Sequence, residues 1–547
     1  PASADLRTTV FLLAGACFFS GIALRICDGL LPRLPTEFEI SAGAAGRVVL
    51  TFSIAYSLMQ LLFGPLGDRF GKARMVTLAL AGCALMSAAA ALAWFVLPPA
   101  ARGHAARTVA LAWLLAAAAN AAIALGQYFN LVHTSTWWIS AAAPGEAYGN
   151  LRQRNQLATL LALGLASAFY LLASARGAVR VALALAIVLL SAACALTASR
   201  TGLLQWLILS GLVLALPWRG ASRAWWVWGL LPLAAYALAL AAGPALFTVI
   251  TGQDPTTLID RLGANLGCVS RKVLWANALY LASLKPWTGW GPGEMDYAHH
   301  VTLYPGERFC LIVDNAHNLF LHVAVEGGFV LAALLLLGLA VWVLRARPWR
   351  EREPDRLLAW AALGVLMLHS QVEYPLWYGP FQLAALLAIS LLWRPAAISQ
   401  VGSGLRLGLS ALATVAVAYV LWDYHRISQL FLPETARAAA YRTDTLQKVR
   451  STVLFLPQVQ FAQFTTTELS RANAAPMAEL GEQVLHYSPE PQVVEKLIEA
   501  WRLAGRPDRA DWHVERFRAA FPEEFATWQR AGSAPAAAAA TAPSPAP

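Results

Sequence analysis

Residues 313–344 read VDNAHNLFLHVAVEGGFVLAALLLLGLAVWVL. Most of this stretch is apolar, and it is longer than the about 20 residues that a membrane-spanning helix needs. Its first residues are polar and include Asn315, His317 and Asn318. Polar groups beside a membrane segment are costly unless they have a partner or a task. The stretch therefore predicts a membrane helix over residues 317–344 with a functional site at its start.

The composition extends this prediction to the whole chain. Of the 547 residues, 58% are hydrophobic and 13% are charged, and the mean hydropathy is +0.53. Soluble domains have about 45–50% apolar and about 25% charged residues. We expect an all-α polytopic membrane protein with about 11–12 transmembrane helices. The candidate spans are residues 9–31, 47–66, 75–97, 108–127, 156–175, 178–197, 203–217, 225–249, 317–344, 357–374, 379–394 and 405–422.

The net charge of +10 indicates which loops lie in the cytoplasm. It does not indicate a nucleic-acid partner. Much of it lies in short loops at residues 67–74, 217–223 and 345–353. Basic short loops lie on the cytoplasmic side of a membrane. Counting helices outward from the last two loops predicts the external segments, which are residues 128–155, 198–202, 250–316, 374–379 and the chain from 425 onward. In a bacterial inner membrane this face is the periplasm, and no cleavable signal peptide is expected.

Two of the six cysteines fall in the predicted external loop 250–316. Cys268 and Cys310 can pair there, because an oxidising compartment permits disulfides. Such a bridge would close a loop of about 40 residues, worth about 4 kcal/mol in the chain-entropy model. Two free thiols are the alternative. The others lie in apolar segments and are expected to be packing residues; they are Cys17, Cys27, Cys83 and Cys194.

The chain divides by composition into four parts. Residues 97–424 form the predicted membrane core, and residues 425–532 form a predicted helical domain outside the membrane. In this domain apolar residues recur every three or four positions, and a Gly-Arg-Pro break separates two helical stretches. The pattern is similar to a tetratricopeptide hairpin. Residues 533–547 are rich in Ala and Pro, and we expect them to be disordered.

Residues 1–96 differ from the core. Their loop GDRFGKAR (67–74) and the segment RICDGLLPRLPTEF (25–38) resemble the N-terminus of major facilitator superfamily transporters. The fragment supplies at most three of the about twelve helices that such a transporter needs, arranged in two halves. Its topology also conflicts with that of the core by one crossing. We interpret this as a fusion near residues 94–100; a native extension is the alternative.

Polar residues gather at the predicted external helix ends. Four arginines at these predicted helix ends, Arg152, Arg154, Arg200 and Arg271, indicate an anionic partner such as a lipid diphosphate, because guanidinium binds phosphate with paired hydrogen bonds. Each arginine alone could instead be a lipid-headgroup anchor. His317 is the candidate general base. Supporting candidates are Gln153, Asn155, Gln156, Asn315, Asn318, Glu326, His369, Glu373, Tyr374, Trp377 and Tyr378. We expect no metal, because no carboxylate cluster or suitable histidine spacing is present.

Six motifs in chain order carry a resemblance to a known family. They are GNLRQRNQLATLL (149–161), SRTG (199–202), an Arg and a Trp separated by three residues (271–275), PWTGWGPG (286–293), DNAHNLFLHVAVEGG (314–328) and HSQVEYPLWYGPF (369–381). Together they resemble the PglL-type O-linked oligosaccharyltransferases of the superfamily of WaaL O-antigen ligases and Wzy polymerases, over about residues 105–530. LRQRNQ and EYPLWY favour the protein-glycosylating branch.

The resemblance implies a GT-C-like membrane glycosyltransferase without a cofactor. It would transfer a glycan from undecaprenyl diphosphate to Ser or Thr of a periplasmic protein such as pilin. The four arginines would hold the diphosphate, and His317 would deprotonate the acceptor. An O-antigen ligase acting on the lipid A core, or a polymerase, would use nearly the same site. Family members usually begin with several more membrane helices, whose place the transporter-like fragment takes here, so a transporter-like or inactive fusion protein stays a further alternative.

Overall fold

The computed structural model describes residues 102–132, 139–140, 142–215, 225–263, 267–392 and 403–533. All of them belong to one compact unit of the chain, residues 84–547. The transporter-like fragment at residues 1–96, with its three predicted spans, and the predicted disordered tail beyond residue 533 lie outside the described residues.

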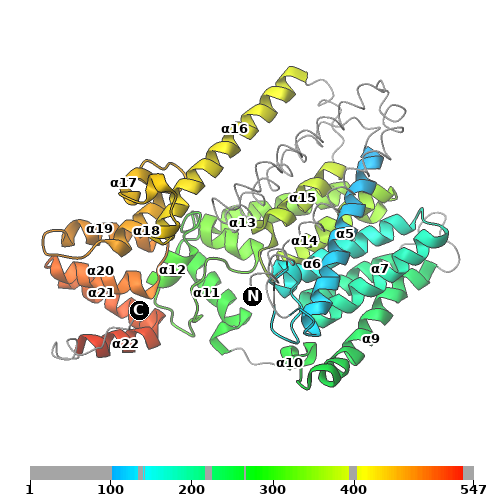
Figure 1. Cartoon of the computed structure of the whole chain (residues 1–547), viewed down its shortest axis with the longest axis horizontal. Helices are drawn as coiled ribbons and strands as arrows, with labels where there is room; N and C mark the ends of the chain where they lie inside the picture. The colour runs from blue at the N-terminus through cyan, green and yellow to red at the C-terminus, as the bar shows by residue number, and fades with distance from the viewer. Residues whose placement is uncertain are drawn as a thin grey trace, which may run out of the picture. The chain divides into compact units, whose positions relative to one another are not determined.

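The described elements are all helices, which confirms the predicted fold class (Figure 1). They are α5 (Arg102–Tyr128), α6 (Arg154–Leu172), α7 (Gly177–Leu196), α8 (Arg200–Ala215), α9 (Trp225–Thr251), α10 (Leu258–Gly263), α11 (Arg271–Leu284), α12 (Met295–Val301), α13 (Leu319–Ala346), α14 (Pro354–His369), α15 (Gly379–Leu392), α16 (Ser403–Ser428), α17 (Thr445–Val449), α18 (Leu456–Thr466), α19 (Ala474–Leu485), α20 (Pro491–Leu503), α21 (Pro507–Ala520) and α22 (Pro522–Ser533). Short 3-10 helices lie at Gly149–Leu151, Gly267–Val269, Pro348–Arg350, Pro375–Trp377, Gln429–Phe431, Glu434–Ala436 and Ala439–Tyr441.

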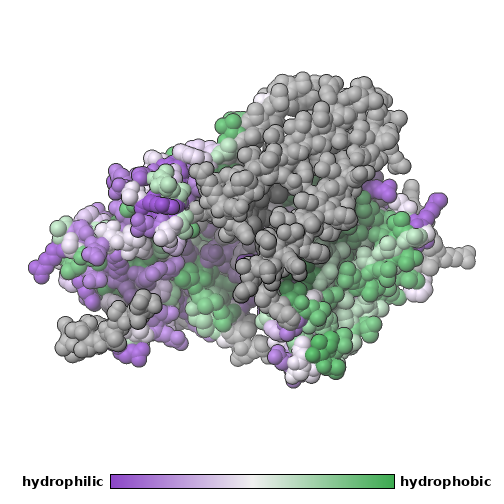
Figure 2. Space-filling model, viewed as in Figure 1, coloured by the Kyte–Doolittle hydropathy of each residue, from purple (hydrophilic) through white to green (hydrophobic). Residues whose placement is uncertain are grey.

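A helix occupies each of the nine candidate spans that fall within the described part of the chain. Among these residues, α5, α6, α7, α9 and α13 are long and apolar enough to cross a membrane, and α8 and α15 are shorter apolar helices. On the face seen in Figure 2, hydrophobic residues cover the part formed by α7 and α9, and hydrophilic residues predominate on α18–α22. The exposed apolar side chains of Leu185, Leu238 and Val249 fit a lipid environment.

Helix α6 lies at the centre of the membrane core and contacts α5, α7, α8 and α14. In the apolar stretch of α6, 83% of the residues are buried. In the other four long apolar helices among the described residues, the buried share is 11–44%. Small residues permit this close packing, as is common between membrane helices. A Cβ atom on Gly164 would lie 2.4 Å from Cβ of Ala117 in α5, and one on Gly202 would lie 2.8 Å from Cβ of Ala158.

Helix α13 is broken at Gly328, although the apolar run predicts one continuous span. Gly328 has φ 81° and ψ 166°, outside the helical region. The glycine-rich turn after α11 supplies the missing hydrogen bonds: Trp290 N donates to Val325 O at 2.9 Å, and Gly291 N donates to Glu326 O at 3.0 Å. A Cβ on Gly289 would lie 2.3 Å from the Glu326 carbonyl. The two backbones therefore come into contact at glycine residues. The hydrogen bonds from the glycine-rich turn stabilise the break in α13.

The segment before α13, which the sequence predicts to be external, is closed by the disulfide Cys268–Cys310, with the two Cα atoms 5.6 Å apart. This confirms the pairing that the sequence left open. Helix α12 lies within the closed segment, and its His299 bonds Tyr304 Oη at 2.7 Å and the Phe309 carbonyl at 3.0 Å.

Removing this disulfide is expected to destabilise the protein. Cys310→Ser should lower the free energy of unfolding by up to about 4 kcal/mol, because the bridge closes a loop of about 40 residues. Mass spectrometry of unreduced peptides should show Cys268 joined to Cys310, and thermal unfolding in detergent should show a lower midpoint for the variant. Two free thiols in the purified protein would contradict the structure.

The chain beyond α16 is helical. Helices α19, α20 and α21 pack in sequence around a hydrophobic core, and α18 and α22 adjoin them. The Gly-Arg-Pro break lies where predicted, since α20 ends at Leu503 and α21 begins at Pro507. This region contacts α12: His486 Nδ1 lies 2.6 Å from Glu294 Oε2, and Arg516 Nε donates to the Val301 carbonyl at 3.0 Å.

Candidate active site

His317 lies in a turn that ends directly at the start of α13. Asn318 is the N-cap of this helix, and its Oδ1 accepts a hydrogen bond from Leu321 N at 3.0 Å. Asn315 Oδ1 accepts from His317 N at 2.7 Å, and the φ of His317 is 50°. Few non-glycine residues adopt this left-handed conformation, and those that do often lie at functional sites. The motif DNAHN thus positions the imidazole at the helix start.

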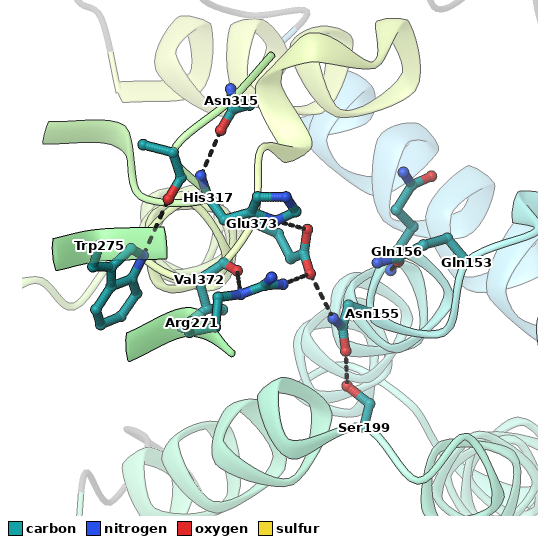
Figure 3. A network of polar contacts seen from close by, with 11 residues as sticks. Gln153, Asn155, Gln156, Ser199, Arg271, Trp275, Asn315, His317, Val372 and Glu373 are labelled. Atoms are coloured by element: carbon teal, nitrogen blue, oxygen red, sulfur yellow. Dashed lines mark hydrogen bonds and ion pairs between the residues drawn. The ribbon is translucent and has the colours of Figure 1, made fainter. Parts of the chain in front are cut away.

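Glu373 is the centre of the polar network in Figure 3. Its Oε2 lies 2.7 Å from His317 Nδ1, and its Oε1 pairs with Arg271 Nη2 and accepts from Asn155 Nδ2 at 3.2 Å. Arg271 Nε also donates to the Val372 carbonyl at 3.2 Å. Three predicted site residues from separate segments therefore meet at the carboxylate of a fourth, Glu373, whose side chain is only 11% exposed.

The electrostatics of this network keep Glu373 ionised. Burial alone would raise the pKa of the Glu373 carboxyl, but the hydrogen bond from His317 and the charge of Arg271 outweigh it and hold the pKa below its ordinary value. An ionised carboxylate only accepts hydrogen bonds, so the proton of neutral His317 belongs on Nδ1. The lone pair of Nε2 is then available as a general base, which is the arrangement of a His–carboxylate pair.

Of the aromatic residues that follow Glu373, Tyr374 contacts His317 directly. The Tyr374 ring meets the imidazole edge-on, with the ring centres 4.8 Å apart. Tyr378 stacks on Tyr374 at 5.9 Å, and Trp377 lies 5.5 Å from His322. Burial raises the pKa of Tyr374, so its hydroxyl stays protonated.

The start of α6 contributes the polar side chains opposite His317. Gln153 is the N-cap of α6, and its Oε1 accepts from Gln156 N at 2.6 Å. Asn155 Oδ1 accepts from Ser199 Oγ at 2.7 Å, and Ser199 Oγ accepts in turn from Gly202 N at 3.0 Å. The starts of α6 and α8 are thereby tied to Glu373 through Asn155.

The four predicted arginines do not form one group. Arg271 belongs to the Glu373 network. Arg154 instead pairs with Glu146 at 3.1 Å and donates to Tyr148 Oη at 2.9 Å. Arg200 is the exposed first residue of α8. Arg152 is exposed in the turn before α6, with φ 55°, and neither network includes it.

Two supporting candidates lie away from His317. His369 is fully buried, and its Nδ1 lies 2.8 Å from Thr159 Oγ1 within the helix core. Glu326 accepts from Gly293 N at 2.8 Å and lies 3.5 Å from His322 Nε2, so it stabilises the break in α13. Neither side chain contacts the imidazole of His317. Within the described ranges, no group of three or more His, Cys, Asp or Glu side chains is arranged to hold a metal.

Sequence reasoning missed Arg261 on α10 and Glu146. Arg261 Nη1 donates to the Ala198 carbonyl at 2.9 Å, beside the start of α8. Burial and the nearby charges of Arg154 and Arg200 lower its pKa. The available signal was weak: Arg261 lies in the predicted external loop, as Arg271 does, but no motif surrounds it. Glu146 precedes α6 in the predicted external segment 128–155 and gave no pattern of its own.

Comparisons with known proteins identify relatives for the segments that build this site. The family model described as "O-Antigen ligase" matches residues 185–336, and the model of a "Protein glycosylation ligase" matches residues 147–172. The model described as "Virulence factor membrane-bound polymerase, C-terminal" matches residues 357–534.

A curated relative adds a weaker match. A "General O-oligosaccharyltransferase" of Acinetobacter baylyi (strain ATCC 33305 / BD413 / ADP1) is 24% identical over 110 residues, which cover 20% of this chain and 19% of that protein. The chain thus spans about a fifth of the length of the curated relative that it matches. No solved structure matches the chain significantly.

The family models match the chain from residue 147 onward, so the transporter-like resemblance of residues 8–93 stays a prediction. They support the family that the motifs indicate: over residues 147–172, 185–336 and 357–534 the chain is similar to ligases of the PglL and WaaL type and to the related membrane-bound polymerases.

Proposed function

We propose that this protein transfers a glycan from an undecaprenyl diphosphate donor to Ser or Thr of a periplasmic protein such as pilin, at the periplasmic face of the bacterial inner membrane. The observation that carries the proposal is the pairing of His317 with ionised Glu373, next to arginine side chains. The matches to protein glycosylation and O-antigen ligases support the class of reaction.

In this reaction His317 Nε2 accepts the proton of the acceptor hydroxyl. The hydroxyl oxygen forms a bond to the anomeric carbon of the glycan while the bond from that carbon to the diphosphate oxygen breaks. The lipid diphosphate leaves as an anion, and guanidinium groups stabilise its growing charge where water is scarce. General base catalysis of this kind contributes about 10²–10⁴-fold to a rate. The proposed reaction uses neither a metal nor a cofactor.

A second function uses the same chemistry with another acceptor. An O-antigen ligase would transfer the glycan to a sugar of the lipid A core, and a polymerase would transfer it to a growing glycan. The matches over residues 185–336 and 357–534 favour these activities as much as protein glycosylation. An experiment must therefore determine which molecule accepts the glycan.

Complementation in cells tests both functions. The chain would be expressed in a strain that lacks its own O-oligosaccharyltransferase and O-antigen ligase but makes a lipid-linked glycan and a pilin. We expect a glycan-sized mass increase of pilin. Glycan on lipopolysaccharide without modified pilin would favour the ligase. Neither product, with stable protein in the membrane, would contradict the proposal and favour an inactive fusion.

A further inference from the structure

The glycine-rich turn between α11 and α12 carries two tryptophans in different surroundings. Trp290 packs against the protein, where its Nε1 donates to the Leu281 carbonyl at 2.9 Å. Trp287 is instead 77% exposed, and no hydrogen bond joins its indole to another described residue. The turn itself is fixed by backbone hydrogen bonds to α13. The fold therefore holds a large apolar ring outside its own core.

The exposed Trp287 lies where the apolar surface of α13 begins. A Cβ on Gly328 would lie 2.6 Å from the backbone carbonyl of Trp287, so this tryptophan adjoins the break in the helix. After the break, residues 329–344 contain no charged side chain, and Leu331 and Leu334 are exposed. Exposed leucines on a helix that is long enough to cross a membrane fit a lipid environment. The surface of Trp287 is thus continuous with the lipid-facing surface of α13.

The end of α11 adds apolar side chains next to this turn. Leu279 and Leu284 are exposed in the second half of the helix, whereas the exposed residue near its start is Lys272. Lys285 follows the helix, and its Nζ lies 4.1 Å from the ring centre of Trp290. Tryptophan and lysine beside a lipid-facing helix are typical of the membrane–water interface, where both side chains reach the head groups.

We propose that the end of α11 and the turn after it form a membrane anchor, which lies in the head-group layer and binds phospholipid. The membrane anchor consists of Leu279, Leu284, Lys285 and Trp287. An indole has an apolar body and a polar N–H, so it can contact acyl chains while the N–H donates to a lipid ester carbonyl. The ammonium group of Lys285 can approach lipid phosphates, and anionic lipids strengthen this attraction.

The membrane anchor would fix the height of α11 over the membrane. This helix begins at Arg271, which bonds Glu373 at the candidate site. The binding of phospholipid by the anchor requires no glycan transfer. The inference therefore stands or falls separately from the proposed function.

Hydroxyl-radical oxidation of the unaltered protein tests this location. The full chain would be placed in nanodiscs of phosphatidylethanolamine and phosphatidylglycerol, and the oxidation of each tryptophan would be measured by mass spectrometry. Trp512 on α21 is the matched control, because it is 39% exposed among hydrophilic helices. If both side chains were in water, the more exposed Trp287 would be oxidised faster. We expect the reverse order, because lipid excludes water from Trp287.

Photochemical crosslinking identifies what covers Trp287. Trp287→p-benzoylphenylalanine places a benzophenone there, which bonds to a neighbouring C–H group on irradiation, so the mass of the adduct identifies the neighbour. We expect phospholipid adducts as abundant as those of Trp342→p-benzoylphenylalanine, which changes a residue of α13 beyond the break. Trp512→p-benzoylphenylalanine should give none. The disulfide Cys268–Cys310, observed in unreduced peptides, verifies that each variant has folded.

Faster oxidation of Trp287 than of Trp512 would overturn the inference. So would phospholipid adducts that form at position 342 and not at position 287. A crosslink from position 287 to a peptide of this chain would show that protein covers the turn, which also contradicts the membrane anchor. Equal phospholipid adducts at position 512 would show that the contact is not specific to this turn, with the same consequence.

Discussion

His317→Ala is expected to reduce glycan transfer by about 10²–10⁴-fold, the usual contribution of a general base. The imidazole is the group whose Nε2 can receive the acceptor proton, because Nδ1 faces Glu373 at 2.7 Å. Donor binding should survive, since the arginine side chains near the site are unchanged. The measurement is the rate of glycan transfer to a pilin peptide, with undecaprenyl diphosphate binding followed in parallel.

His486→Ala provides the control for this experiment. His486 also pairs through Nδ1 with a glutamate, Glu294, at 2.6 Å, but it lies on the C-terminal helices away from His317. Its variant should transfer glycan at a rate close to that of the wild type. A His317→Ala protein that transfers glycan normally would remove this histidine from the mechanism.

Glu373→Gln is expected to have the second largest effect, again about 10²–10⁴-fold on transfer. Arg271 and Asn155 both donate to Oε1, so the amide oxygen should stay with them and the amide nitrogen should face His317. The amide would then donate to Nδ1 and force the imidazole proton onto Nε2. In this tautomer the histidine cannot accept the acceptor proton, and the analogous change is severe in serine proteases.

Comparing Glu373→Gln with Glu373→Ala separates orientation from folding. Alanine would leave the side chains of Arg271, Asn155 and His317 without their shared acceptor and should also lower the free energy of unfolding, by about 1–3 kcal/mol. Glutamine should change the unfolding midpoint little. Equal loss of stability in both variants, or wild-type transfer by Glu373→Gln, would contradict the proposed control of the tautomer.

The fold class and the polar segments of the site could be predicted from the sequence. In a membrane protein, the apolar helices and the polar residues at their ends are clearly distinct. A histidine, an arginine or a glutamate at the end of an apolar run is conspicuous, and all the helix ends concerned were placed on one face by loop charges. The helix break around residues 503–507 could also be predicted, because Gly and Pro interrupt the regular spacing of apolar residues there.

The pairings could not be predicted, because contacts between distant segments leave no local pattern. Arg271 and Glu373 are 102 residues apart, and Asn155 and Glu373 are 218 apart. His369 looked like a site residue because it lies at a predicted external helix end, yet its side chain faces Thr159 in the core. The break at Gly328 was hidden because the turn that stabilises it lies far upstream, at residues 286–293.

The break in α13 also determines how deep the reaction site lies. The part of α13 after Gly328 runs from Phe329 to Ala346, about 27 Å of helix at the usual rise, which nearly equals the thickness of the hydrocarbon layer. The nine residues before the break are therefore not needed for the crossing, and His322 and Glu326 need not enter lipid. His317, which precedes these nine residues, would then lie outside the hydrocarbon layer, in the layer that head groups share with water. A donor whose lipid tail stays in the membrane and an acceptor that stays in water could both reach His317 in this layer.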